Sequence, residues 1–238
     1  MKVIAHRGAS GYEPENTLLA IQAAMDLMVD AIEIDVHLAG NDLVVIHDRW
    51  LDKTTNGKGR VSETTLEAIK QLDAGKGQTV PTLWEVLSLV NGRCELHIEL
   101  KSEKTVKPIL KTLYRALDEL DFTQLQFVIS SFNHHLLRDI KMLDNTWRIG
   151  ALCATLPLEY ARFAQKLNAY SVNVDVDFIN QKFVDDAHER GLKIFVYTVE
   201  HARDIEDLLA MKVDGIFTNY PTESMVSIAH SKSRSTTI

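Results

Sequence analysis

The sequence predicts an α/β fold, a single (β/α)₈ barrel with a small insertion. Its 238 residues suit one barrel, and an apolar share of 45% is enough for a large core. Short apolar runs alternate along the chain with amphipathic segments of helical spacing, a pattern typical of a parallel sheet with helices outside it. No linker rich in proline, glycine or serine divides the chain, so we expect one domain.

Nine segments have the composition and length of strands. They are residues 3–6, 31–38, 43–47, 95–100, 126–130, 148–152, 171–174, 193–199 and 215–218. Between them, apolar residues recur at helical spacing, as Val106, Leu110, Leu113 and Leu117 do. Thr17, Ser62 and Thr82 are residue types that start helices.

The connection between the second and third strands explains why there is one strand too many for a barrel. Only residues 39–42 lie between them, and a parallel crossover needs about a dozen residues. We therefore expect an antiparallel hairpin with its turn at Gly40-Asn41-Asp42. A turn centred near Asn41 pairs Asp35 with His47, and a register two residues away also fits.

Two segments interrupt or follow the barrel pattern. Residues 48–79, after His47-Asp48, have no strand period and predict an insertion over one end of the barrel. The catalytic barrel is expected to span residues 1–222. Residues 223–238 are expected to form a loose C-terminal tail. From residue 227 this segment is rich in Ser, Thr and Lys.

Charged residues follow one face of two predicted strands, although strands of a parallel barrel are usually apolar throughout. Alternation puts the polar residues of each strand on one side: Glu33, Asp35 and His37 in the first, and Glu95, His97, Glu99 and Lys101 in the second. A solvated antiparallel sheet would explain either strand alone. It explains both less well in a chain of βα repeats.

Buried carboxylates without partners cost several kcal/mol. A hard divalent cation removes that cost, and three carboxylates with water suit Mg²⁺ or Ca²⁺, with Mn²⁺ also accepting oxygen ligands.

Other polar residues are expected at the carboxyl ends of barrel strands, where barrel enzymes place their active sites. His6-Arg7 follows the first strand, His47-Asp48 ends the hairpin and Lys101 ends the fourth strand along the chain. Arg7, Lys101 and a cation would surround an anion, and two histidines would supply an acid and a base. Each residue alone is more typical of a surface or structural position, but together they suit phosphodiester cleavage.

These residues, in this order, resemble the glycerophosphodiester phosphodiesterase family of the cytosolic bacterial type. The resemblance covers about residues 3–222. The matching pieces are His6-Arg7-Gly8, Pro14-Glu15-Asn16-Thr17, Glu33-Ile34-Asp35-Val36, His47-Asp48, Leu72-Asp73-Ala74-Gly75, Val80-Pro81-Thr82-Leu83, Glu99-Leu100-Lys101, Ser130-Ser131-Phe132, Tyr197-Thr198-Val199 and residues 214–221.

The resemblance implies a role for each site residue. Glu33, Asp35 and Glu99 would bind the metal, His6 and His47 would be the acid/base pair, and Arg7 and Lys101 would hold the phosphate. The implied reaction is hydrolysis of glycerophosphodiesters, such as glycerophosphocholine or glycerophosphoethanolamine, to an alcohol and glycerol 3-phosphate.

The sequence departs from the family pattern at three positions. Tyr197 stands where the family usually has Trp, Glu200 where it usually has Asn, and Asn219 where Asp is frequent. These departures bear on substrate preference more than on the chemistry.

Charge and hydropathy narrow the partners and the competing functions. A formal net charge of −7 argues against nucleic acid as a partner. The sequence contains no run of 18 apolar residues, so we expect no stable membrane insertion and a cytoplasmic location. The expected partner is a small-molecule substrate. A related barrel phospholipase of the lysophospholipase D or C type is the alternative function, but it needs an exposed apolar rim or a membrane-docking helix. A non-catalytic binder of glycerophospho-ligands is less favoured, because all seven site positions are intact. The sequence does not indicate the oligomeric state.

Overall fold

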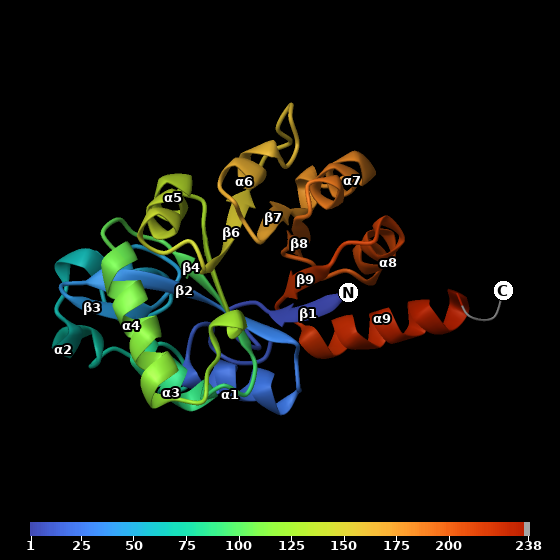
Figure 1. Cartoon of the computed structure of the whole chain (residues 1–238). Coiled ribbons are helices and arrows are strands. Elements are labelled where there is room, and N and C mark those ends of the chain that lie inside the picture. The colour runs from blue at the N-terminus through green and yellow to red at the C-terminus, as the bar shows by residue number, and fades with distance from the viewer. Residues whose placement is uncertain (236–238) are drawn as a thin grey trace.

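The computed structural model describes residues 1–235 and confirms the (β/α)₈ barrel (Figure 1). Eight parallel strands close into a ring because β1 pairs with both β9 and β2. The strands are β1 (Lys2–Ala5), β2 (Ala31–Ala39), β4 (Glu95–Leu100), β5 (Phe127–Ser131), β6 (Arg148–Cys153), β7 (Ser171–Asp175), β8 (Lys193–Tyr197) and β9 (Gly215–Thr218).

Helices cover the outside of the ring, as Figure 1 shows. They are α1 (Leu18–Asp26), α3 (Leu83–Val90), α4 (Val106–Glu119), α5 (His134–Leu143), α6 (Arg162–Lys166), α7 (Gln181–Glu189), α8 (Ala202–Met211) and α9 (Pro221–Ser235). Thr17 and Thr82 cap α1 and α3 as predicted, the second in a reciprocal capping box with Glu85. The predicted start at Ser62 is wrong, because Thr65 caps the nearest α-helix.

The predicted hairpin is present, with β3 (Asp42–Val45) antiparallel to β2, but its register is wrong by one residue. Ala39 pairs with Asp42, so the turn holds only Gly40 and Asn41. The Asp35 carbonyl accepts a hydrogen bond from Ile46 N at 3.0 Å, and Asp35 does not pair with His47. Two-residue hairpin turns need a positive φ at their first position, and Gly40 supplies one at 59°.

The insertion between β3 and α3 packs on the hairpin. It contains two 3₁₀ turns, Leu51–Lys53 and Val61–Glu63, and the short helix α2 (Leu66–Ile69). Leu51, Val61 and Ile69 form a small core with Val44 and Ile46, separate from the main core of the barrel. The hairpin therefore has an apolar support of its own, which holds His47 beside the ends of the barrel strands.

The expectation of a loose tail is wrong as far as Ser235, since this stretch forms α9. Residues 236–238 lie outside the described residues. Helix α9 contacts both α8 and β1, with Ser224 and Ile228 buried. Each barrel strand needs a helix over its apolar outer face, and α9 is the helix of the last βα unit.

The barrel interior is filled below the site. Ile4, Ala31, Phe195 and Phe217 form an internal cluster, and His97 lies against the edges of both phenylalanine rings at centroid distances of 5.4 and 5.5 Å. The Glu95 carboxylate accepts hydrogen bonds from His97 Nε2 at 2.9 Å and Lys2 Nζ at 2.8 Å. The polar face of β4 therefore has two parts. Glu95 and His97 form an internal structural group, and Glu99 lies at the mouth with Lys101 just after the strand.

No helix among residues 1–235 has both the length and the hydropathy needed to cross a membrane. The cytoplasmic location stays a prediction.

Candidate active site

Three carboxylates meet at the carboxyl ends of β2 and β4. Asp35 and Glu99 are register partners in neighbouring strands, and Glu33 lies two residues before Asp35 on the same face. One oxygen of each lies within 4.8 Å of the others, and all three side chains are buried. Since carboxylate oxygens are the ligands that hard divalent cations prefer, the donor set fits such an ion.

The crowding of these acids changes their proton affinities. Burial, and then the charges of Asp35 and Glu99, raise the pKa of Glu33 well above its usual range. Burial and Asp35 raise the pKa of Glu99 to about 7. Burial also opposes ionisation of Asp35, but Lys101 and Arg7 outweigh it and lower the pKa of Asp35 to about 2. The three acids therefore ionise together only where more positive charge is present.

Two cations lie on the cluster. Lys101 Nζ donates to Glu99 Oε1 at 2.6 Å and lies 3.1 Å from Asp35 Oδ1, in ion-pair contact without hydrogen-bond angles. Arg7 Nε lies 3.3 Å from Asp35 Oδ2, while its Nη1 donates to Glu15 at 3.0 Å. Both cations are thus positioned to contact an anion that binds at the cluster.

A left-handed backbone conformation sets the position of Arg7. Its φ of 57° turns the chain out of β1, and its amide N–H then donates to Glu33 Oε2 at 2.9 Å. Gly8 follows with φ 78°, and a Cβ there would lie 2.7 Å from the Ala20 carbonyl carbon. Only glycine allows this turn to pack so closely on α1.

His6 faces the same cluster from the end of β1. Its Nδ1 lies 2.7 Å from Asn219 Oδ1, and its Nε2 lies 4.0 Å from Glu33 Oε2. Burial and the neighbouring Arg7 lower the pKa of His6 to about 4. The ring is therefore neutral near pH 7 and can accept a proton.

His47 reaches the mouth from the hairpin. His37 Nε2 donates to the His47 carbonyl oxygen at 3.0 Å, so His37 supports the backbone of His47. His47 Nδ1 lies 3.5 Å from Asp48 Oδ2. Burial lowers the pKa of His47 from its usual value, and Asp35 partly opposes this shift. All seven predicted residues thus lie at one mouth.

Several residues at the mouth carried no predicted role. Asn16 donates to Asp35 Oδ2 at 2.9 Å, and its own Oδ1 accepts from the Asp35 amide at 3.2 Å. Asn219 contacts His6 across 213 positions of sequence. Asn16 and Asn219 both lie in pieces that carried the resemblance, which was the signal for a role, but their partners depend on the closed barrel.

The cavity at the cluster is a narrow slot of about 30 Å³. The polar part of its lining consists of His6, Glu33 and Glu99 together with Ser130 and Asn173. The apolar part of its lining consists of Phe132, Leu152, Tyr197 and Phe217. The Tyr197 hydroxyl donates to the Cys153 carbonyl at 3.1 Å, which holds this ring in the lining.

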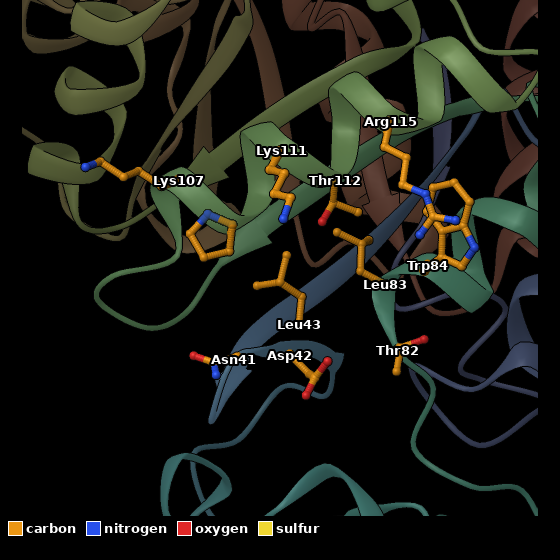
Figure 2. Close-up of a pocket in the computed structure, with 11 residues that line it drawn as sticks. Asn41, Asp42, Leu43, Thr82, Leu83, Trp84, Lys107, Lys111, Thr112 and Arg115 are labelled. Atoms are coloured by element: carbon orange, nitrogen blue, oxygen red, sulfur yellow. The ribbon is translucent and has the colours of Figure 1, made fainter.

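A larger groove, of about 570 Å³, lies outside the barrel between the hairpin, the start of α3 and helix α4 (Figure 2). Lys111 points into it, Lys107 lies at its edge, and the Arg115 guanidinium stacks on the Trp84 ring at 3.6 Å. It contains none of the seven predicted residues. The smaller slot, in contrast, is lined by His6, Glu33 and Glu99.

The fold and the mouth together define a barrel enzyme with a carboxylate cluster, two histidines and two cations at the carboxyl ends of its strands. Residues 6–223 match the model of the glycerophosphoryl diester phosphodiesterase family, and the chain belongs to that family.

Similar proteins agree with this assignment. A glycerophosphodiester phosphodiesterase of Caldanaerobacter subterraneus subsp. tengcongensis is 40% identical over 236 residues, 95% of this chain and 96% of that protein. A phosphodiesterase of Oleispira antarctica, solved in complex with the product sn-glycerol-3-phosphate, has a TM-score of 0.88 at 29% identity, covering 96% and 97% of the two chains. The glycerophosphodiester phosphodiesterase of Agrobacterium tumefaciens has a TM-score of 0.79 at 26% identity, covering 93% and 97%.

Proposed function

We propose that this enzyme hydrolyses glycerophosphodiesters to glycerol 3-phosphate and an alcohol. Glycerophosphocholine and glycerophosphoethanolamine are the substrates to try first. The observation that carries the proposal is the convergence of three buried carboxylates, two cations and two histidines at one mouth of the barrel. The product bound to the Oleispira antarctica relative supports the substrate class.

Glu33, Asp35 and Glu99 are proposed to hold one divalent cation, Mg²⁺ or Ca²⁺, with Mn²⁺ as a third candidate. The raised pKa values of Glu33 and Glu99 support this, because a cation allows all three acids to ionise together. When bound, such an ion polarises a phosphoryl oxygen as a Lewis acid.

The chain's own residues supply binding and proton transfer. Arg7 and Lys101 hold the anionic phosphodiester and oppose its charge. His6 accepts a proton at Nε2 from the water that attacks phosphorus, and His47 delivers one to the oxygen of the departing alcohol as its bond to phosphorus breaks. Arg7 and Lys101 add to burial in lowering the pKa of His47, and the negative charge of a bound phosphodiester opposes the effect of these two cations.

Release of glycerol 3-phosphate from glycerophosphocholine tests this function. The protein is stripped of metal, and Mg²⁺, Ca²⁺ or Mn²⁺ is added back. Metal-restored release is expected, with loss of about 100-fold or more in Glu99→Gln. Glu103→Gln, an exposed acid on the loop after β4, is the matched control and should keep full activity. No release with any of the three ions, from protein folded by circular dichroism, would contradict the proposal.

A second candidate is hydrolysis of lysophospholipids, because exposed apolar side chains lie on several loops that follow barrel strands. Phe132, Leu156, Leu158 and Phe178 lie on the loops after β5, β6 and β7, and Leu158 is fully exposed. Phe132 packs edge-on against Tyr197, and both rings line the slot. An acyl chain could lie along this side while the phosphate occupies the charged side.

Phe132→Ser with Leu158→Ser tests this candidate. Turnover of lysophosphatidylcholine should fall while that of glycerophosphocholine persists. Met142→Ser removes an equally exposed apolar group at the far end of α5, away from the mouth, and should change neither rate. Equal loss on both substrates would remove the second candidate.

A further inference from the structure

Asn219 and Glu200 form a hydrogen-bonded pair behind His6. Asn219 follows β9, and its Nδ2 donates to Glu200 Oε1 from the loop after β8. Its Oδ1 lies 2.7 Å from His6 Nδ1 and 2.9 Å from the Ser10 hydroxyl. These are two of the three positions at which the sequence departs from the family pattern, and here they contact each other.

The chemistry of these groups determines which way the Asn219 amide points. An ionised carboxylate only accepts hydrogen bonds, so the NH₂ group of Asn219 must face Glu200. The amide oxygen then faces His6, and it also only accepts. The reversed amide would set its oxygen against the Glu200 carboxylate and its NH₂ against Nδ1, leaving two acceptors facing each other.

The same reasoning extends to the imidazole ring. Because Asn219 Oδ1 is an acceptor, His6 Nδ1 must carry the hydrogen, and a neutral ring then has its lone pair on Nε2. Nε2 is the ring nitrogen nearest the acidic cluster, 4.0 Å from Glu33, and His6 lines the slot. The nitrogen that faces a bound substrate is therefore the one able to accept a proton.

We propose that Asn219 and Glu200 are positioning residues that fix His6 in the Nδ1–H tautomer with Nε2 directed into the slot. The amide orients the ring as a carboxylate would, without setting a negative charge against it. Glu200 acts one step further away, by holding the amide in the required orientation. The catalytic part of this inference rests on the proposed role of His6, but the tautomer does not.

Substitutions at Asn219 and at Glu200 distinguish the contributions of the two positioning residues to kcat. Asn219→Leu removes the acceptor at similar volume, so kcat should fall about 10- to 100-fold with little change in KM. Glu200→Ala frees the amide to reorient and should lower kcat by a smaller factor. Glu200→Gln should keep near wild-type kcat, because the glutamine carbonyl can still accept from Asn219 Nδ2. Asn145→Leu and Glu103→Ala, both at exposed positions, are the controls.

A spectroscopic measurement tests the tautomer without turnover. In metal-free protein, ¹⁵N NMR of the imidazole should find His6 as Nδ1–H in wild type and Glu200→Gln, and as a mixture in Asn219→Leu. An Nε2–H tautomer in wild type would overturn the proposal. So would Asn219→Leu with wild-type kcat and unchanged His6 signals. A further outcome is that wild type hydrolyses no glycerophosphodiester while its His6 tautomer still differs from that of Asn219→Leu as expected. In that outcome the positioning stands and the proposed function fails.

Discussion

Asn16 supports the central carboxylate of the cluster from behind. Its amide group donates to the Asp35 carboxylate and accepts from the Asp35 backbone, so one side chain fixes both parts of that residue. Asn16 is itself 3% exposed and has φ 58°, a left-handed conformation that Asn adopts more readily than most residues. Groups that orient metal-binding carboxylates commonly set the affinity of the site.

We expect Asn16→Ala to weaken binding of Ca²⁺ or Mn²⁺ by about 10- to 100-fold, because the Asp35 carboxylate loses its fixed orientation. Calorimetric titration of the metal-free protein measures this without any substrate. Asn145→Ala, at an exposed position, should bind as wild type does. Unchanged affinity in Asn16→Ala would show that Asp35 needs no such support.

At the scale of elements, the sequence predicts strands better than it predicts registers and the last helix. All nine strands were found within two residues of their expected ends, because buried parallel strands are short apolar runs with clear borders. The hairpin register was missed by one residue because Gly40 permits a tighter turn than one centred on Asn41. Helix α9 was missed because its exposed positions are rich in serine, which blurs the helical period.

Helix α9 can be tested by two substitutions on the same helix. Ile228 is 7% exposed and Val226 is 50% exposed. Ile228→Ala should lower the free energy of unfolding by about 2 to 4 kcal/mol through the cavity it leaves. Val226→Ala should change it by less than about 0.5 kcal/mol. Urea denaturation measures both, and an equally small effect in Ile228→Ala would mean that α9 adds little to the barrel.

At the scale of the whole molecule, the carboxylate cluster could be anticipated because a charged face on a buried strand is a strong local signal, while the roles of the seven predicted residues stay predictions. Their supports could not be predicted in the same way. His6 meets Asn219, and Lys2 meets Glu95, only because β1 closes the ring between β9 and β2. Local patterns do not encode contacts that depend on closure of the whole barrel.

The internal Glu95 group gives the molecule a pH dependence of its own. Burial opposes ionisation of Glu95, but hydrogen bonds from His97 and Lys2 outweigh it and lower the pKa of Glu95 from 4.5 to about 2. A depressed folded pKa stabilises the protein above the unfolded value. This stability is lost as the pH falls from about 4.5 towards 2.

We therefore expect Glu95→Gln to be less stable than wild type by about 1 to 3 kcal/mol at pH 6, and the difference to shrink towards pH 3. Denaturation of both proteins at several pH values measures it, and titration of the site carboxylates, common to both, cancels in the comparison. A difference that does not depend on pH would contradict the assignment of this effect to the Glu95 charge.

Closure of the ring by β1 and β9 also affects when the enzyme can first act. Synthesis on the ribosome produces the chain from its N-terminus, so β1 can pair early with β2 but must wait for its second partner, β9, which lies more than 200 residues later. His6 has its partner Asn219 only after β9 has emerged and paired. Until then, β1 and β8 each have one edge without its partner strand, and these edges are open to wrong pairings. Catalysis would thus begin late, in a single step, once the last strand has joined the first.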